Sequence, residues 1–272
     1  MYIAIDLGGT KTLIAAYTDE GQIIRSEKHP TEKVFHKFLE KLPETIDKVA
    51  NGEQIDGIAI AAPGLINYDN NEVKTFGHLD WKNVDIVTPL QEHYGQNVHI
   101  DNDGNMGALG EANMGAGAGY EKALYVTLST GIGTGITYKG ELSPTLKESE
   151  GGMMEFMHEG KLTRWEDFAS GSAFVDEFGK FGADDDDPAD WQKWSENVSL
   201  GMVGLISIIQ PDVIVIGGSM GVHIHKYHDF LHSEIQKLRG VTVDMPVLVG
   251  AEHPEEAVIN GCYIACKQRA QN

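Results

Sequence analysis

The stretch DLGGTKT, residues 6–12, holds the first residues whose types and spacing could do chemistry. Backbone amides left uncovered by Gly8 and Gly9, with two threonine hydroxyls and a lysine, suit a phosphate chain. The carboxylate of Asp6 suits the Mg²⁺ that accompanies such phosphates. The apolar runs 3–5 and 13–17 on either side predict two strands, so a plain hairpin turn is the alternative interpretation.

Two other glycine-rich turns follow apolar runs farther along the chain. TGIGTG, residues 130–135, stands between two apolar runs, in the same order as the first hairpin. GGS, residues 217–219, directly follows another apolar run. We call these turns the first (8–11), second (130–135) and third (217–219) glycine loops. Because the first two share one plan, the sequence suggests two halves that each carry a phosphate loop.

The elements that must position these loops alternate between strands and helices. Apolar periodicity predicts helices over 34–50, 86–93, 106–114 and 198–209, and buried strands over 57–62, 98–100 and 213–216. The segment 181–190, with four consecutive aspartates, is predicted to be a solvated loop. A glycine-rich stretch before residue 120 marks the expected junction between an N-terminal α/β domain, 1–116, and a C-terminal α/β domain, 117–272. The last helix is a candidate to pack back on the first domain.

The composition is that of an acidic globular protein. Its 272 residues are 41% hydrophobic, and 41 Asp and Glu against 21 Lys and Arg give a formal net charge of −20. Such a charge repels phosphate backbones and anionic membrane surfaces, so neither nucleic acid nor a membrane is an expected partner. Any anionic substrate must therefore be met by a local site.

The two cysteines, Cys262 and Cys266, lie four residues apart in a segment with helical character. Their spacing and small number predict core positions rather than a disulfide or a metal site. A reducing compartment follows as the default, and the sequence shows neither a basic leader nor an apolar run of about 18 residues. We therefore expect a cytoplasmic protein.

The three glycine loops in this order, with NDGN (102–105) between the first two, resemble the ROK family of sugar kinases and repressors, within the actin-like ATPase superfamily. The resemblance covers nearly the whole chain. It implies a two-domain α/β fold of the actin-like, ribonuclease H-like kind, with a cleft between the domains for ATP and a sugar. By resemblance, the nucleotide-binding residues are Gly8, Gly9, Thr10, Lys11, Thr130, Gly131, Gly133, Gly217 and Gly218, with Mg²⁺ near Asp6.

The stretch IDNDGNMGALGE, residues 100–111, resembles the family's N-D-A-N followed by A-L-G-E. The resemblance implies that Asp103 is the general base and that Asn102 binds the sugar. A carboxylate can accept the proton of a sugar hydroxyl while the γ-phosphoryl group of ATP is transferred. A calcium loop fits poorly, because Met106 and Ala112 occupy the positions that need Gly and Glu. A simple turn is the other alternative.

The stretch MEFMHEGKLTRWEDFASG, residues 154–171, matches the family only in part. Glu155, His158 and Glu166 keep the spacing of residues that hydrogen-bond sugar hydroxyls in the family, although ordinary surface acids are the alternative. The family's cysteine-rich zinc motif is absent, so no structural zinc is expected. Apolar packing by Met154, Phe156, Met157 and Trp165 could hold this segment instead. Gly64 and Thr75 are lesser candidates for contact with the sugar.

The resemblance thus implies an ATP-dependent kinase that phosphorylates a hydroxyl of a hexose or an N-acetylhexosamine, as a glucokinase does. The alternative is a catalytically weak sugar-sensing or regulatory protein, and the presence of Asp103 with all three loops favours the enzyme. A repressor of the family would carry a helix-turn-helix, which the sequence does not show. The sequence does not identify the sugar or the oligomer, although relatives commonly form homodimers.

Overall fold

The computed structural model describes residues 1–76, 79–95, 97–240 and 243–270. The chain folds into two compact units: Met1–Gly110 together with the C-terminal segment from Val258, and Glu111–Ala257. We call them unit 1 and unit 2. The division falls inside helix α3 (Asp103–Met114), ahead of the junction expected from the sequence, and it assigns most of the last helix, α9 (Ala257–Ala270), to unit 1.

The main sheet of unit 1 has the strand order β3-β2-β1-β4-β8. Strands β1, β2 and β3 are antiparallel, and β4 and β8 continue the sheet parallel to β1. The bounds are β1 Tyr2–Leu7, β2 Lys11–Tyr17, β3 Ile23–Pro30, β4 Gly57–Ala62 and β8 Val98–Asn102. A small antiparallel sheet holds β5 (Ile66–Asn67), β6 (Glu72–Phe76) and β7 (Leu79–Asp85).

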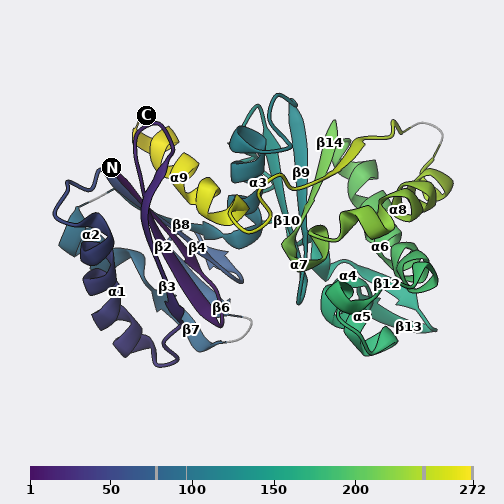
Figure 1. Cartoon of the computed structure of the whole chain (residues 1–272), viewed down its shortest axis with the longest axis horizontal. Coiled ribbons are helices and arrows are strands. Elements are labelled where there is room, and N and C mark those ends of the chain that lie inside the picture. The colour runs from purple at the N-terminus through teal and green to yellow at the C-terminus, as the bar shows by residue number, and fades with distance from the viewer. Residues whose placement is uncertain (77–78, 96, 241–242, 271–272) are drawn as a thin grey trace. The chain divides into compact units, whose positions relative to one another are not determined.

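Helices cover both faces of the main sheet of unit 1. Helices α1 (Phe35–Ala50) and α2 (Val87–Tyr94) lie on one side, and α9 lies on the other (Figure 1). Successive strand residues point to opposite faces, so Ile3, Ile5 and Leu7 join the core beneath α1. Ala4 and Asp6 therefore point to the face that α9 covers, where Cys262 Sγ lies 3.5 Å from the carbonyl oxygen of Ile5.

The main sheet of unit 2 repeats this topology with the order β11-β10-β9-β14-β15. An antiparallel hairpin, β9 with β10, is continued by β14 and β15, which run parallel to β9. The bounds are β9 Lys122–Leu128, β10 Ile132–Tyr138, β11 Glu141–Leu142, β14 Val213–Gly217 and β15 Val247–Gly250. The shared plan predicted from the first and second glycine loops is thereby confirmed at the level of strand order.

The helices of unit 2 pack around an aromatic core. Trp191 and Tyr227 stack with ring centroids 5.4 Å apart, and Phe174 and Trp194 pack beside them. The elements are the 3₁₀ turns η1 (Gly151–Met153) and η2 (Gly182–Asp184), the hairpin β12 (Glu155–His158) with β13 (Lys161–Arg164), and helices α4 (Trp165–Ala169), α5 (Gly171–Phe178), α6 (Pro188–Ile209), α7 (Gly218–Gly221) and α8 (Ile224–Leu238).

Two predicted boundaries were wrong for local reasons. Helix α6 begins at Pro188 rather than at residue 198, because Asp187 caps it through Ala189 and proline suits its first turn. Helix α3 begins at Asp103 rather than at residue 106, since the amide of Gly104 in its first turn donates to Asn102 Oδ1. The solvated loop predicted at 181–190 was wrong in two places, because residues 188–190 begin helix α6 and the side chain of Asp185 is fully buried.

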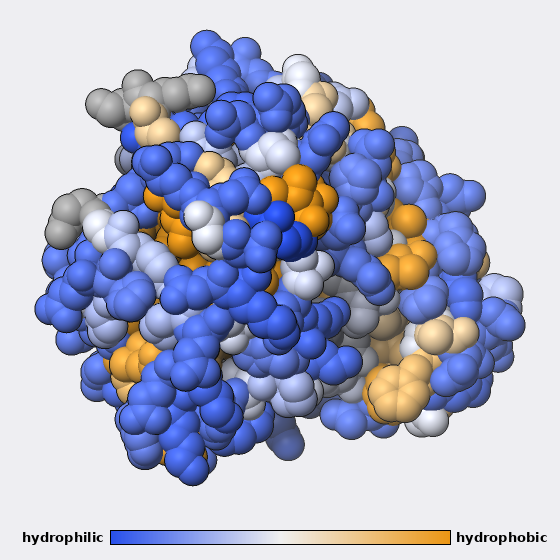
Figure 2. Space-filling model, turned by 60° about the vertical axis from the view of Figure 1, so that its left-hand side comes forward, coloured by the Kyte–Doolittle hydropathy of each residue, from blue (hydrophilic) through white to orange (hydrophobic). Residues whose placement is uncertain are grey.

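One face of the molecule is mostly polar (Figure 2). Figure 2 shows a face dominated by hydrophilic residues with separate apolar spots, in keeping with the net charge of −20. Among the residues that the structure describes, no helix combines the length and the apolar character needed to cross a membrane.

Candidate functional site

The first glycine loop closes tightly on itself at the tip of β1 and β2. The amide of Gly8 donates to the carbonyl of Lys11 at 3.0 Å, and a Cβ at Gly8 would lie 2.8 Å from that oxygen. The carbonyls of Gly8 and Gly9 accept bonds from Thr31 Oγ1 (2.7 Å) and Lys33 Nζ (2.6 Å). The loop is therefore fixed from outside by two residues that the sequence motif did not include, while Thr10 and Lys11 stay exposed.

Asp6 and Asp103 form a pair of acidic side chains in unit 1, each only partly exposed. Burial raises the pKa of Asp103 to about 6, although backbone amides partly oppose the shift. Burial also raises the pKa of Asp6 to about 6, with a further rise from the charge of Asp103 and a small opposing effect of Lys28. A carboxylate with a pKa near neutrality is suited to accept a proton, and a neighbouring pair suits a divalent cation.

The structure brings Asn102, Gly64 and Thr75 together in unit 1. Asn102 Nδ2 donates to the carbonyl of Gly64 at 3.1 Å. Gly64 has a φ of +103°, and a Cβ there would lie 1.9 Å from the carbonyl oxygen of Thr75. Only glycine fits this position, because both the backbone conformation and the close approach exclude a side chain. Asn102, which directly precedes Asp103, thus links the predicted residues Gly64 and Thr75 to the start of α3.

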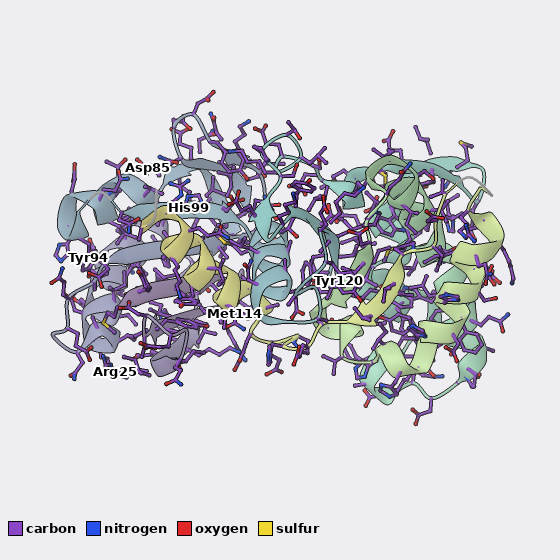
Figure 3. The ribbon with its side chains drawn as sticks, turned by 90° about the horizontal axis from the view of Figure 1, so that it is seen from above. Arg25, Asp85, Tyr94, His99, Met114 and Tyr120 are labelled. Atoms are coloured by element: carbon purple, nitrogen blue, oxygen red, sulfur yellow. The ribbon has the colours of Figure 1, made fainter. Side chains whose placement is uncertain are left out.

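Asp101 supports this arrangement, and sequence reasoning missed its role. Its buried carboxylate accepts bonds from Tyr68 Oη, Asn105 Nδ2 and the amide of Asn102, each at 2.8 Å. His99, labelled in Figure 3, places Nε2 3.6 Å from the second oxygen. Burial alone would raise the pKa of Asp101, but the bonds from His99, Asn105 and Tyr68 outweigh it and lower the pKa. The carboxylate form of Asp101 is thereby favoured, and it anchors the turn that begins α3.

In unit 2 the second and third glycine loops lie side by side. The third loop follows β14, and Gly218, with a φ of +78°, would place a Cβ 2.5 Å from the carbonyl oxygen of Leu128 at the end of β9. The second loop is bound to α5, because the amide of Gly171 donates to the carbonyl of Ser129 at 2.7 Å. Predicted residues Thr130, Gly131, Gly217 and Gly218 are thereby gathered at one edge of the sheet, while Gly133 lies in β10.

A cavity of about 540 Å³ opens beside these two loops, within unit 2. Ser129, Thr130, Ser219 and Met220 line it on the loop side. The start of α5 and the segment 181–184 form its other walls, and His223 completes the lining. Burial, together with the charges of Lys226 and His225, lowers the pKa of His223, which favours the neutral ring. A cavity that joins two glycine loops has the size and the backbone chemistry for a nucleotide.

Glu166 lies against the second glycine loop. A Cβ at Gly131 would be 2.8 Å from Glu166 Oε2. Arg164, at the end of β13, is 3.3 Å from Glu166 Oε1 and also binds both carboxylate oxygens of Asp167. Glu155 lies opposite Arg164 in the register of the β12–β13 hairpin. Asp167 is the main cause of the raised pKa of the guanidinium, and Glu166 and then Glu155 add smaller contributions. Glu166 thus pairs with a cation that the sequence motif did not flag, and Glu155 lies opposite that cation in the hairpin.

His158 lies on the other face of the same hairpin. Residues three apart in a strand point to opposite faces, so Glu155 and His158 diverge along β12. The imidazole stacks on Phe168 with centroids 4.3 Å apart and planes at 8°. Both rings line a second cavity of unit 2, about 460 Å³ in volume, together with Lys161 and Lys193.

Apolar packing was predicted to hold the segment 154–171, and it holds only part of that segment. Trp165 is fully buried and donates from Nε1 to the carbonyl of Asn197, while Met154 and Phe156 pack against the core. Met157 is 70% exposed, so its expected packing role was wrong. In the described part of the chain, no group of three or more His, Cys, Asp and Glu side chains could hold a metal ion. The hairpin closes instead through a two-residue turn at Glu159 and Gly160, with φ values of +49° and +78°.

Glu111 is a second buried carboxylate that sequence reasoning did not assign. It closes the ALGE motif and accepts backbone bonds from Ala116 (2.9 Å), Glu252 (3.1 Å) and His253 (3.2 Å). Its place among small and apolar residues of a predicted helix could have signalled such a role, because an unpaired acid is rarely placed in a core.

The family model described as "ROK family" matches residues 2–269. The chain belongs to the ROK family. Among relatives of this ROK protein, the glucokinase of Thermotoga maritima is 34% identical over 143 residues, covering 52% of this chain and 45% of that enzyme. The fructokinase of Zymomonas mobilis is 30% identical over 245 residues, covering 81% of this chain and 80% of that enzyme.

The alignments to the first glucokinases span about half of those proteins, 45% and 57% of their lengths. A xylose repressor is also among the relatives of this ROK protein. Among solved structures, a ROK family glucokinase from Streptomyces griseus, in complex with glucose and AMPPNP, superposes with a TM-score of 0.81 at 20% identity, covering 100% of this chain and 99% of that one. This likeness confirms the predicted actin-like ATPase fold.

Proposed function

We propose that this ROK protein is an ATP-dependent sugar kinase that transfers the γ-phosphoryl group to a hydroxyl of a hexose or an N-acetylhexosamine. The observation that carries the proposal is the placement of Asp103. It starts α3 beside Asn102, which is anchored to Gly64, and its carboxyl has a pKa of about 6. At pH 7 such a group is ionised by about ten to one, yet it is basic enough to take a proton.

The proposed reaction is a direct transfer. The sugar hydroxyl gives its proton to Asp103 while its oxygen forms a bond to the γ-phosphorus, and the bond from that phosphorus to the ADP oxygen breaks. Asn102 and the backbone of Gly64 and Thr75 would orient the sugar. Orientation matters because a displacement of about 1 Å can cost on the order of 10²-fold in rate.

Asp6 is the residue proposed to hold Mg²⁺. Its raised pKa reflects burial and the charge of Asp103, and a cation relieves both effects. When bound with ATP, Mg²⁺ neutralises part of the phosphate charge. The amides of the first and second glycine loops and the side chain of Lys11 would contact the phosphates.

The nucleotide is proposed to occupy the cavity of unit 2 beside the second and third glycine loops. Its volume of about 540 Å³ supports this role, as does its lining by both loops. Glu155, Glu166 and His158 remain the proposed sugar contacts of unit 2. Since Glu155 and His158 point to opposite faces of β12, separate substitutions are needed to learn which of them the sugar meets.

The proposal does not include structural zinc. We expect no stoichiometric zinc in the purified protein and full activity after chelation once Mg²⁺ is restored. About one zinc per chain by elemental analysis would contradict this expectation. Two free, buried cysteines support a reducing compartment, so the proposal places the protein in the cytoplasm. The proposal includes no nucleic acid or membrane partner. The proposed assembly is a homodimer.

The deciding experiment is a coupled ADP-release assay across a panel of free sugars, with Asp103→Asn as the test variant. The amide keeps the shape of the side chain but cannot take the proton, so kcat should fall on the order of 10²-fold or more while ATP and sugar still bind. Asp69→Asn, an exposed aspartate of unit 1, is the matched control. A variant that keeps more than about a tenth of wild-type kcat would refute the assignment.

The alternative is a regulatory ROK protein that binds sugar without efficient turnover. We consider this alternative because a repressor is among the relatives. The same assay separates the two. Saturable sugar binding without sugar-dependent ADP release in the wild-type protein would favour the regulator.

A further inference from the structure

One wall of the nucleotide cavity is built by a segment that the sequence presents as a simple acidic loop. Phe181, Gly182, Ala183 and Asp184 line the cavity, and the aspartates 184–187 continue the chain toward α6. A run of four aspartates is normally solvated. Here one of them, Asp185, is fully buried and lies at the centre of a polar network.

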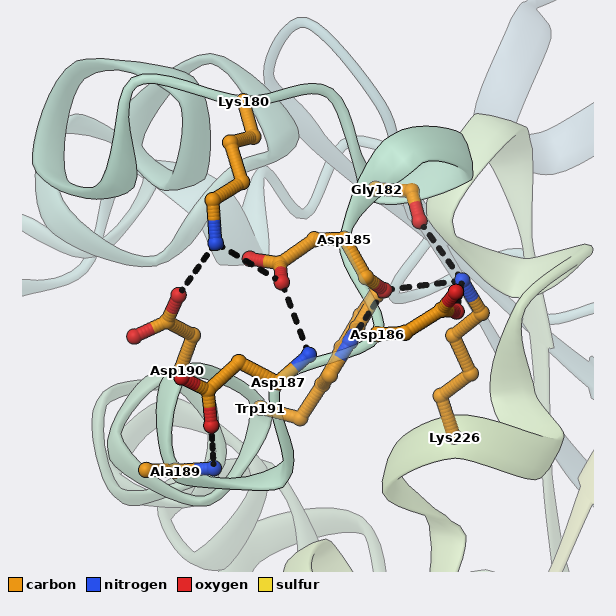
Figure 4. A network of polar contacts seen from close by, with 9 residues as sticks. All are labelled: Lys180, Gly182, Asp185, Asp186, Asp187, Ala189, Asp190, Trp191 and Lys226. Carbon is orange, nitrogen blue, oxygen red and sulfur yellow. Dashed lines mark hydrogen bonds and ion pairs between the residues drawn. The ribbon is translucent and has the colours of Figure 1, made fainter.

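Asp185 is held through both its side chain and its backbone. Its Oδ1 accepts bonds from the amide of Asp187 (2.9 Å) and from Lys180 Nζ (3.2 Å), and Lys180 also reaches Asp190 at 3.3 Å (Figure 4). Its carbonyl accepts bonds from Trp191 Nε1 at 3.0 Å and from a second lysine. The acid is thereby tied to the end of α5, to α6 and to α8.

Lys226 of α8 is the second lysine, and it is mostly buried. Its Nζ donates to the carbonyl of Gly182 at 3.1 Å and to the carbonyl of Asp185 at 2.8 Å. These carbonyls flank the 3₁₀ turn η2, so one ammonium fixes both ends of the turn (Figure 4). Its ion pair with Asp186 at 2.9 Å adds little, because Asp186 is 92% exposed.

The segment also packs closely between these anchors. A Cβ at Gly182 would lie 3.1 Å from the ring of Trp191 and 3.1 Å from the sulfur of Met220. Met220 itself lines the cavity. A shift of the 181–184 segment would therefore change the cavity directly, and the polar network is what opposes such a shift.

We propose that Lys226 and Asp185 are positioning residues for the nucleotide, which hold the 181–184 wall in the shape that admits the base and ribose of a nucleoside triphosphate. Neither residue lines the cavity. The inference rests on the proposed function, because it assumes that the cavity binds the nucleotide. Without the ammonium, the carbonyls of Gly182 and Asp185 lose their shared donor, and the wall is no longer fixed at both ends.

The test compares Lys226→Met with Lys237→Met, an exposed lysine of the same helix. Calorimetry with AMPPNP gives the Kd, steady-state kinetics give separate KM values for ATP and for the sugar, and thermal unfolding gives Tm. Lys226→Met should raise the Kd of AMPPNP and the KM of ATP about tenfold, worth about 1.4 kcal/mol, and leave the sugar KM within about twofold. Lys237→Met should change none of these values.

The outcomes distinguish a loss of positioning from a general destabilisation of the protein. An ATP KM within about twofold of wild type in Lys226→Met would overturn the inference, and so would an equal rise in the sugar KM. Asp185→Asn gives an independent second variant with the same expected split. If wild-type protein turns over the sugar but AMPPNP binds equally to wild type and Lys226→Met, only this inference fails. If wild-type protein binds no AMPPNP, the proposed function fails first.

Discussion

Burial raises the pKa of Asp6 in unit 1, and the negative charge of the neighbouring Asp103 raises it further. Burial contributes more than this repulsion, and both groups reach a pKa of about 6. A base and a proposed metal ligand with the same apparent pKa lose their charge over the same pH range. Activity and stability should both respond to pH near 6, but in opposite directions.

The proposed reaction needs both carboxylates ionised, so we expect kcat to fall as the pH is lowered through about 6. Because bound Mg²⁺ keeps Asp6 ionised, only the proton on Asp103 remains, and the decline should approach one log unit per pH unit on the acid side. A pH–rate profile between pH 5 and 8, with saturating Mg²⁺-ATP and sugar, measures it. A rate that stays constant down to pH 5 would rule out Asp103 as the base.

Stability should change in the other direction. A carboxyl whose pKa is raised on folding binds its proton more tightly in the native state, so its stabilising effect is present below about pH 4 and is lost as the pH rises through 6. At pH 7.5 the charged Asp103 therefore destabilises the fold. Asp103→Asn should raise Tm by roughly 2–4 °C at pH 7.5.

The difference in Tm between Asp103→Asn and wild type should narrow as the pH is lowered from 7.5 to 5.5. Asp69→Asn, which changes an exposed aspartate, should show no such dependence. A lower Tm for Asp103→Asn than for wild type at pH 7.5 would mean that the folded protein stabilises the Asp103 carboxylate more than its burial indicates.

Gly64 and Gly52 offer a matched pair for testing the sugar side of the site. Both have positive φ, +103° and +80°, but a Cβ at Gly52 has no neighbour within 4 Å, whereas one at Gly64 would clash with Thr75. Gly52→Ala should cost about 1 kcal/mol of unfolding free energy from backbone strain alone. Gly64→Ala should cost more and should also raise the sugar KM, as urea unfolding and kinetics would show. Equal effects of the two variants would mean that the Thr75 contact is unimportant.

Arg164→Met tests how the acidic residues of the hairpin are held. The guanidinium is about half exposed, so removing its ion pairs should change Tm little. It should nevertheless raise the sugar KM about fivefold and leave the ATP KM within twofold, because Glu166 loses its ion pair and Glu155 loses the positive charge opposite it. Lys48→Met, which breaks an exposed ion pair with Glu27, is the control and should leave both KM values unchanged. An unchanged sugar KM in Arg164→Met would show that the hairpin acids act independently of it.

Apolar periodicity was sufficient to predict the helices and strands that bury one face. Helix α1 buries Phe38, Leu42 and Ile46, as the pattern predicted, and the hairpins that carry the first and second glycine loops were confirmed. In these elements the burial of each residue is decided by its own strand or helix. Local sequence therefore carries the necessary information.

Asp185 and Arg164 could not be predicted in this way, because their roles depend on partners from other elements. Nothing in the run of four aspartates distinguishes the one that meets Lys180 and Trp191. Arg164 is separated from Glu155 by the hairpin turn, and the part of the family motif that this chain matches does not include the arginine. Contacts between neighbouring elements, which no single strand or helix pattern reveals, decided both roles.

The folding of unit 1 depends on helix α9, which is synthesised after unit 2. Its residues Cys262 and Tyr263 pack on β1 and β2, and Tyr17 Oη bonds Asn260 Oδ1 at 2.7 Å across 243 positions of sequence. On the ribosome, unit 2 is translated before α9 emerges, so unit 2 can fold while the face of unit 1 around Ala4 and Asp6 is still uncovered. The carboxylate proposed to bind Mg²⁺ would therefore reach its buried state only after the last helix has been made.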